Sequence, residues 1–103
     1  MWFDILTIFP EFFVSPLNEG MVRRALCAEQ IRVAGHNIRD PAQDRHHMTD
    51  DRPFGGGEGM VMKPEPLAAC LKAAVGEGPT PRFILLSPRG ERFDQAAAAR
   101  LAE

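Results

Sequence analysis

The stretch from Asp50 to Met60 carries the residue types that most clearly suggest chemistry. Its four glycines allow positive φ angles, and without side chains they let backbone N–H groups approach a ligand. Beside them, Asp50 and Asp51 are suited to accept hydrogen bonds from a base edge or to bind a hydrated Mg²⁺, while Arg52 is suited to clamp a phosphate. The combination indicates a ligand-binding loop.

Two other interpretations of this stretch stay open. A flexible linker would explain the glycines, but not the flanking charges or the apolar run Met60-Val61-Met62. A solvated loop in which Asp51 and Arg52 pair locally would explain the charges. A Walker loop and a dinucleotide fingerprint are excluded, because no Gly-Lys-Ser/Thr follows and the glycines do not open a helix with GxGxxG spacing.

A second candidate site is the turn from Ser87 to Gly90, which follows the apolar run at 83–86. Proteins of the α/β class bind ligands outside the carboxyl ends of their strands, so this position suggests a ligand contact. No histidine lies near Ser87 in the sequence, and a nucleophilic serine would need a distant partner. A plain turn at the end of a strand is the alternative.

The remaining reactive residues indicate no site by themselves. His46 and His47 are adjacent, which suits a joint metal site poorly, so a phosphate contact and a plain surface position both stay open. Cys27 and Cys70 lack CxxC spacing and are expected to be free thiols. A redox or hydrolytic enzyme built on either cysteine or on Ser87 is a third, weaker hypothesis, because no partner constellation accompanies them.

The net charge of −2 gives no basic footprint for nucleic acid, so any such surface must be local. The candidate is 32–52, where arginines and histidines alternate with aspartates. With 45% apolar and 25% charged residues, the composition is that of a globular protein. No apolar run approaches the roughly 20 residues of a membrane helix, and no basic leader is present, so we expect a cytoplasmic protein.

The apolar patterning predicts alternating strands and helices that would position these sites. We expect a buried strand at 2–9, a helix capped by Asn18 that runs to about 29, a half-exposed strand at 31–38, a long loop at 40–59, a helix from Pro64 to Gly76 with Pro66 in its first turn, a buried strand at 83–86, and a helix at 95–102 capped by Asp94.

This order predicts a single domain over 1–103 of the α/β class, with a mainly parallel sheet and flanking helices. A loop as long as 40–59 inside a small domain is usually functional. The sequence finishes in a helical pattern without a stop signal, so we expect it to be part of a longer domain.

Together the segments resemble the bacterial tRNA (guanine-N1)-methyltransferase family over nearly the whole chain. Its most specific part is the string DDRPFGGGEGMVM at 50–62. Glu58 stands where the family often has proline, and Arg89 where it often has glutamine. The resemblance is further carried by ILTIFPEFF at 5–13, Gly20, Arg24-Ala25, Arg39-Asp40, Asp44-Arg45-His46, Pro66-Leu67, LSPRG at 86–90 and Gln95.

The resemblance implies the amino-terminal part of a SPOUT (trefoil-knot) domain, active as a homodimer with its active sites between subunits. Its activity would be methyl transfer from S-adenosylmethionine to N1 of the guanine 3′ of the anticodon, tRNA position 37, with Mg²⁺ as an ion that the resemblance leaves open. The cofactor would contact Leu85, Leu86, Ser87, Pro88 and Gly90. The anticodon stem-loop would contact His46, Asp50, Arg52, Gly55, Gly56, Gly57 and Gly59.

The resemblance places the knot, the other cofactor loops and the general-base aspartate beyond position 103. We therefore assign no catalytic residue and no metal ligand within 1–103, and expect these residues alone to be inactive. The alternative is a small non-catalytic α/β module that binds RNA or a nucleotide. The ionisable stretch 32–52 supports that alternative, but a basic excess and stacking aromatics at RNA-motif spacing are lacking.

Overall fold

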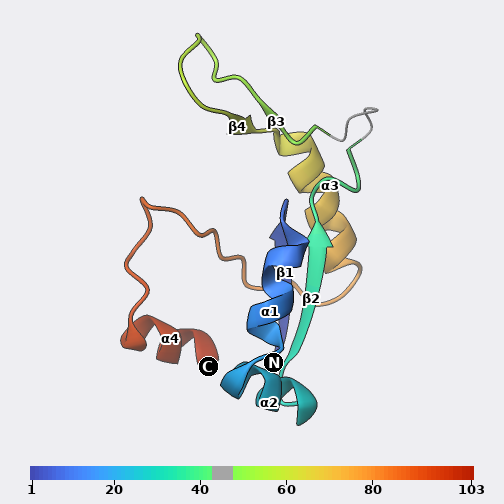
Figure 1. Ribbon diagram of the computed structural model, residues 1–103, viewed down its shortest axis with the longest axis vertical. Helices are drawn as coiled ribbons and strands as arrows, with labels where there is room; N and C mark the ends of the chain where they lie inside the picture. The colour runs from blue at the N-terminus through green and yellow to red at the C-terminus, as the bar shows by residue number, and fades with distance from the viewer. Residues whose placement is uncertain (43–47) are drawn as a thin grey trace.

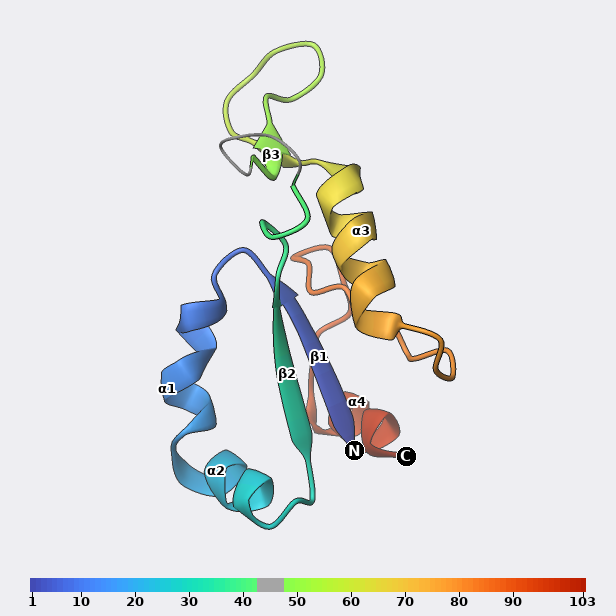
Figure 2. The ribbon, with the colours of Figure 1, turned by 90° about the vertical axis from the view of Figure 1, so that its right-hand side faces the viewer.

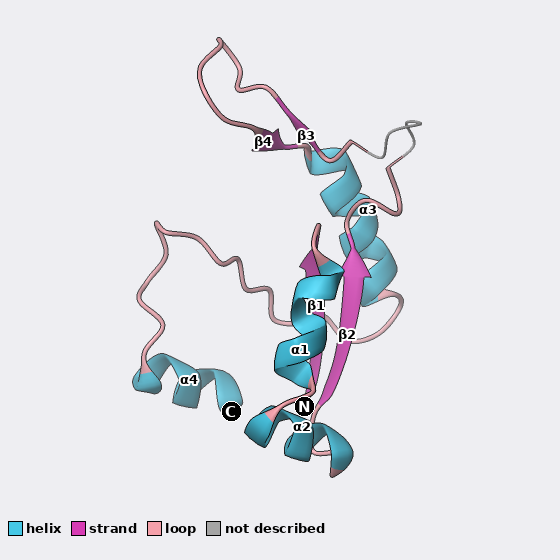
Figure 3. Cartoon of the chain, in the orientation of Figure 1, coloured by secondary structure: helices cyan, strands magenta, loops and turns pink. Residues whose placement is uncertain are grey.

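The computed structural model describes residues 1–42 and 48–103, and its two longer strands pair in parallel. Strand β1 (Trp2–Thr7) lies beside β2 (Arg32–Asn37), with Trp2 opposite Arg32 and Thr7 opposite Asn37. A parallel pair needs a crossover, and here the chain between the strands is largely helical (Figures 1 and 3). The two strands predicted in the first forty residues are therefore confirmed, as is the parallel sheet.

The first strand is less buried than its apolar run predicts. The side chains of Trp2 and Phe3 are exposed, and those of Ile5 to Thr7 are half-buried. The cause is a shortage of cover, because β1 pairs along one edge only and α3 is the helix that contacts both strands. The prediction of a buried strand at 2–9 is thus wrong in its burial and correct in its conformation.

The crossover contains two α-helices instead of the single predicted one. A short 3₁₀ helix η1 (Pro10–Phe13) leads into α1 (Val14–Leu17), and α2 (Gly20–Cys27) follows. Asn18 ends α1, where its Nδ2 donates to the Val14 carbonyl at 2.8 Å. The extended backbone of Glu19 separates the two helices. Asn18 is therefore a carboxyl-terminal cap, and the prediction that it begins a helix is wrong.

A short antiparallel pair divides the predicted long loop. Asp50–Asp51 (β3) pairs with Val61–Met62 (β4), Asp50 lying opposite Met62. In addition, the Lys63 amide donates to the Thr49 carbonyl at 2.7 Å. These bonds turn residues 50–62 into a hairpin, so only parts of 40–59 are irregular. Each strand has only two residues, which is too short for an alternating apolar pattern to predict it.

The two later helices follow the predictions closely. Helix α3 (Pro64–Val75) has proline in its first turn, where a missing N–H is harmless, and it ends at Gly76. Helix α4 (Gln95–Ala102) begins at Asp94, whose Oδ1 accepts a hydrogen bond from the Ala97 amide at 2.8 Å. No helix in the described part of the chain is long and apolar enough to cross a membrane.

The apolar run at 83–86 forms no strand, contrary to the prediction. It has no secondary structure, and the side chains of Leu85 and Leu86 are 86% and 89% exposed. A strand needs a hydrogen-bonded neighbour and cover for its apolar faces. The described residues supply neither at this point, so composition alone misled the prediction.

Few of the described side chains are buried: apart from Thr49, which precedes β3, they lie just after β2 and on α3. Ile38, Ala42 and Cys70 are the buried apolar residues described, with Pro66 on the same helix. Figure 2 shows α3 on one side of the two strands and α1 on the other. The radius of gyration is 16.0 Å, against about 13 Å for a compact domain of about 100 residues. The arrangement is therefore open.

Candidate functional site

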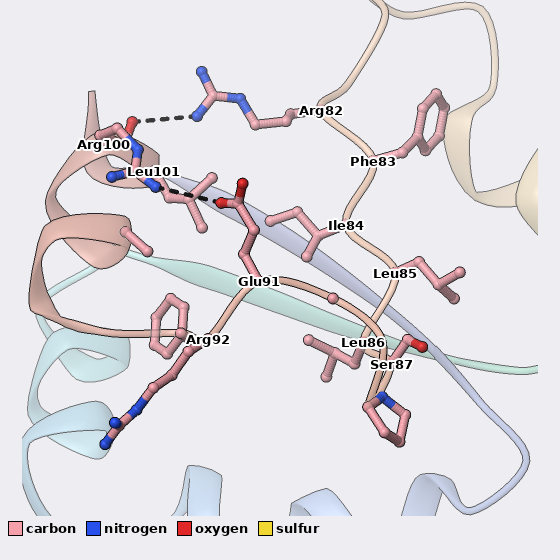
Figure 4. A pocket seen from close by; sticks show the side chains of 14 residues that line it. Arg82, Phe83, Ile84, Leu85, Leu86, Ser87, Glu91, Arg92, Arg100 and Leu101 are labelled. Atoms are coloured by element: carbon pink, nitrogen blue, oxygen red, sulfur yellow. Dashed lines mark hydrogen bonds and ion pairs between the residues drawn. The ribbon is translucent and has the colours of Figure 1, made fainter.

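The five residues that the resemblance assigns to S-adenosylmethionine lie on one hollow. This hollow has a volume of about 760 Å³ and lies between the extended segment 82–93 and α4 (Figure 4). Leu85, Leu86, Ser87, Pro88 and Gly90 all line it, and Ala97 and Leu101 of α4 complete it. The segment 82–93 thus forms one wall of the hollow. Helix α4, which Asp94 caps, forms the other wall.

The wall consists of an apolar extended part and a turn. Among the described residues, no backbone group pairs with the backbone of Phe83 to Leu86. The turn that follows is closed by the Gly90 amide, which donates to the Ser87 carbonyl at 3.0 Å. The Ser87 hydroxyl accepts from the Arg89 amide at 3.2 Å. This hydroxyl therefore stabilises the turn, while the apolar wall keeps unpaired backbone donors and acceptors.

Charged side chains at the hollow were not predicted. Arg82 Nη1 donates to the Arg100 carbonyl at 3.3 Å, and Arg100 Nη2 lies 4.0 Å from Glu91 Oε2 (Figure 4). The Arg100 and Glu91 side chains are 65% and 95% exposed, so water screens this pair and it contributes little stability. Arg82 and Arg100 are eighteen positions apart, and no local sequence signal connects them.

The glycine loop lies at the end of the β3–β4 hairpin. This hairpin projects beyond α3 and away from the parallel strands (Figures 1 and 2). Gly55, Gly56, Gly57 and Gly59 all have positive φ, and that of Gly57 is +123°. No atom lies within 4 Å of the place where a Cβ of Gly57 would be, so space does not require glycine there. Its backbone conformation does.

The charged residues before the glycines begin the hairpin. Asp50 is half-buried and Asp51 exposed, and adjacent strand positions point to opposite faces. Asp51 Oδ1 accepts from the Arg52 amide at 2.7 Å. No carboxylate of the described residues lies within ion-pair distance of the exposed Arg52 guanidinium. The local Asp51–Arg52 contact is therefore made by the backbone, which leaves the guanidinium available to an external anion.

The predicted tRNA contact His46 and a metal site remain to be placed. His46 lies outside the described residues. For the ranges 1–42 and 48–103, no three His, Cys, Asp or Glu side chains converge as a metal site.

Two features were missed by sequence reasoning. His36 Nε2 lies 2.7 Å from Asp4 Oδ1, joining side chains of the two paired parallel strands. Phe54 lies between Arg52 and the glycines and is fully exposed. The sequence could have indicated that Phe54 is exposed, because this aromatic residue has no apolar neighbour at helical or strand spacing.

A smaller hollow of about 280 Å³ lies where β2 ends against α3. His36, Asn37, Asp40 and Cys70 line it. Burial raises the pKa of the Cys70 thiol, and the nearby Asp40 carboxylate raises that pKa further. Both cysteines are free, as predicted, with Cys27 exposed and Cys70 buried. The raised pKa makes Cys70 a poor nucleophile at neutral pH.

The predicted cofactor wall, formed by residues 83–90, and the hairpin are separate within the chain. Figures 1 and 2 place them apart along the long axis of the molecule, with α3 reaching the hairpin and α4 lying near the opposite end. Every residue that lines the larger hollow belongs to 82–101. The structure therefore brings the predicted cofactor residues together, and likewise the predicted tRNA residues that it describes, but does not bring one group to the other.

Comparison with known proteins identifies the family. All of residues 1–103 match the model of the family described as tRNA (Guanine-1)-methyltransferase TrmD. A tRNA (guanine-N(1)-)-methyltransferase of Geobacter sulfurreducens is 56% identical over 102 residues, which are 99% of this chain and 42% of that protein. The relative of the same name from Geobacter metallireducens is 54% identical over 103 residues, with 100% and 42% covered.

A solved structure shows the same arrangement. The crystal structure of tRNA (m1G37) methyltransferase from Aquifex aeolicus superposes with a TM-score of 0.87 at 29% identity, covering 100% of this chain and 46% of that one. The α/β class and the parallel sheet are thus confirmed, and the chain spans less than half the length of these relatives. The chain belongs to the tRNA (guanine-1)-methyltransferase family.

Proposed function

We propose that residues 1–103 supply one wall of an S-adenosylmethionine site and part of a tRNA surface. The complete enzyme would transfer a methyl group to N1 of the guanine at tRNA position 37, 3′ of the anticodon. The observation that carries this proposal is the common hollow of about 760 Å³ lined by Leu85, Leu86, Ser87, Pro88 and Gly90. Membership of the family supplies the chemistry.

The residues present suit S-adenosylmethionine. Ligand sites of about 300–1,000 Å³ are typically apolar with a few polar groups, and this hollow has that size. The exposed leucines 85 and 86 would cover apolar parts of the cofactor, and the unpaired backbone groups of 83–86 would bind its polar edges. When bound, S-adenosylmethionine supplies a methyl group on a positively charged sulfur. The turn at Ser87 to Gly90 would close the end of the wall.

The hairpin would bind the anticodon stem-loop. The exposed Arg52 guanidinium would contact a phosphate, and Asp50 would accept hydrogen bonds from a guanine edge. The backbone N–H groups of Gly55, Gly56, Gly57 and Gly59, together with His46, would add contacts. Because the net charge of the chain is −2, this binding depends on local groups and not on a general basic field.

The separation of hairpin and cofactor wall supports a homodimer. In one chain the two surfaces lie apart, whereas transfer needs donor and acceptor atoms within about 3–3.5 Å. A second subunit would place its hairpin near the cofactor wall of the first. We further propose that the trefoil knot and the general-base aspartate belong to the part by which the relatives exceed this chain, and that the enzyme is cytoplasmic, like its tRNA substrate.

A general base is required because N1 of guanine carries a proton that must leave as the new bond forms. None of the carboxylates of 1–103 is assigned to this step. Mg²⁺ binding at Asp50 or Asp51 stays a proposal.

The test uses a full-length protein of this family that contains residues 1–103, called below the full-length protein. Calorimetry should detect S-adenosylmethionine binding, and labelled methyl groups should enter an unmodified tRNA with guanine at position 37 but not one with adenine there. The family match does not favour the non-catalytic module. Binding of tRNA without cofactor consumption would restore that module.

A further inference from the structure

The side chain of Phe54 is the most exposed large apolar side chain among the described residues, at 107% of its reference area. A turn holds it there, since the Gly56 amide donates to the Pro53 carbonyl at 3.1 Å and Gly55 has φ of +83°. The surrounding hairpin projects from the molecule (Figures 1 and 2). The ring is thus presented at the corner of a closed turn.

Nothing described in the chain covers this ring. The one aromatic pair of residues 1–42 and 48–103 is Phe12 with Phe13, on η1 and not on the hairpin. Leu85 and Leu86 are also strongly exposed, but they line the larger hollow. Phe54 lies outside both hollows. The ring is therefore open to an external occupant.

The neighbours of Phe54 indicate the chemistry of that occupant. Two positions earlier, Arg52 presents a guanidinium without a carboxylate partner among the described residues. An exposed cation beside an exposed aromatic ring suits unpaired nucleotides, because the cation contacts phosphate and the ring stacks on a base. A protein partner would favour a continuous apolar surface. The loop positions adjoining Phe54 are mostly glycine or charged, and the exposed Met60, Val61 and Met62 lie at β4 and not in the loop.

We propose that Phe54 is a positioning residue that stacks on an unpaired base of the tRNA anticodon loop. This inference rests on the proposed function. Stacking is not ionic, so it adds affinity that the chain's acidic balance does not provide. Together, Phe54 and Arg52 would fix the loop by one base and one phosphate.

The test compares variants of the full-length protein in filter binding to unmodified tRNA. Phe54→Leu keeps an apolar side chain but removes the ring, and we expect about tenfold weaker binding. Phe54→Trp keeps a stacking face and should bind within about twofold of the wild type. The salt slope should stay unchanged in both variants, because no phosphate contact is lost. Phe12→Leu, an exposed phenylalanine on η1, is the matched control and should leave affinity unchanged.

A spectroscopic measurement separates stacking from a structural role. An anticodon stem-loop with 2-aminopurine in its loop should lose fluorescence on binding wild-type or Phe54→Trp protein, but not Phe54→Leu protein. Calorimetry with S-adenosylmethionine checks that each variant is folded.

Three results would overturn the inference. Full affinity and full quenching with Phe54→Leu would remove Phe54 from the interface while leaving the proposed function intact. A lower melting temperature or a changed oligomer mass, with unchanged tRNA affinity, would mean that the ring contacts protein. A wild-type protein that binds no tRNA would overturn the proposed function and this inference together.

Discussion

At the scale of single residues, what a side chain already contacts decides what remains for a ligand. Asp51 is engaged by the backbone of its neighbour, whereas the exposed Arg52 guanidinium has no carboxylate of the described residues within ion-pair distance. A guanidinium left in this way is suited to bind phosphate bidentately. Arg52 is therefore a stronger candidate for tRNA affinity than the acidic residue that precedes it.

Substituting Arg52 should separate tRNA binding from cofactor binding. In the full-length protein we expect Arg52→Ala to weaken tRNA binding and to leave the affinity for S-adenosylmethionine nearly unchanged, because the hairpin lies apart from the cofactor wall. Loss of one phosphate contact should also reduce the salt slope by about one. Filter binding at several salt concentrations and calorimetry measure the two affinities.

Arg23→Ala, on exposed α2, serves as the control for loss of one positive charge. Equal losses of both affinities in Arg52→Ala would assign that arginine a structural role.

The two cysteines should differ in reactivity. Cys70 is buried, and its thiol pKa is raised by burial and then by Asp40, whereas Cys27 is exposed. We expect a disulfide reagent at neutral pH to modify Cys27 first, and the rate at Cys70 to rise only at alkaline pH. Because the folded state holds the Cys70 proton more tightly, this stabilisation is complete below the usual thiol pKa and is lost as pH rises through the raised value. Reagent absorbance with Cys27→Ser and Cys70→Ser measures each rate.

Asp40→Asn removes the charge and should speed modification of Cys70, although less than unfolding does, because burial is the larger cause. Equal rates for the two thiols in folded protein would show that Cys70 is accessible.

At the scale of elements, local signals were sufficient where a residue makes its own contact. Asp94 caps α4 and proline begins α3, and both were predicted because caps and first-turn prolines depend on neighbours in sequence. Asn18 was misassigned because the same side chain can cap either end of a helix. Here its side chain bonds back to α1, and the extended Glu19 is the residue that precedes α2. The prediction of a strand at 83–86 failed because a strand depends on partners that are distant in sequence.

In the candidate site, too, features that depend on neighbours in sequence could be predicted and features that depend on distant residues could not. The five residues predicted to contact the cofactor could be grouped because they are consecutive or nearly so, and the structure places them on one hollow. The contributions of Arg82 and Arg100 could not be predicted, because only the packing of α4 against 82–93 brings them together. The pairing of 50–51 with 61–62 was equally invisible in a loop of mixed composition.

Helix α4 should depend on its cap. The Asp94 carboxylate satisfies the Ala97 amide, and its loss typically costs about 1 kcal/mol of helix stability. Because α4 faces the open hollow, we expect Asp94→Ala to fray this helix, with amide exchange at 95–102 roughly fivefold faster. Asp94→Asn, which keeps a capping oxygen, is the control. Unchanged exchange in Asp94→Ala would mean that packing and not the cap holds α4.

The glycine loop should be mobile without tRNA. Gly55 to Gly59 have little side-chain packing, and each of the four glycines keeps a conformation that other residues rarely adopt. We expect backbone order parameters below about 0.6 in the loop, against about 0.85 in α3, with values rising when tRNA binds. A loop that is equally rigid without tRNA, free of ligand and lattice contacts, would contradict this expectation.

At the scale of the whole molecule, the chain has two candidate surfaces, the larger hollow and the hairpin, and each is open to solvent. The larger hollow is lined by residues of 82–101 alone, its leucines are exposed, and the hairpin lies elsewhere. The relatives that share this arrangement are more than twice as long as the chain. If the proposed function holds, the open wall and the projecting hairpin would each bind part of a reaction complex, and neither by itself would align donor and acceptor.

Residues 1–103 alone should therefore transfer no methyl groups to tRNA. General-base catalysis typically contributes roughly 10²–10⁴-fold to a rate, and orientation of the reactants can contribute about 7–11 kcal/mol of the barrier. The chain has no assigned base, and its two candidate surfaces do not meet, so both terms are missing even if each surface binds its ligand.

Purified residues 1–103 would be incubated with labelled S-adenosylmethionine and unmodified substrate tRNA, with the full-length protein as positive control. Separate binding measurements distinguish a folded, ligand-binding but inactive chain from an unfolded one. Turnover above about one part in a hundred of the control would exceed what a reaction lacking its general base should reach. The chain would then contain its own base, and the carboxylates of the hairpin, Asp50 first, would have to be tested for that role.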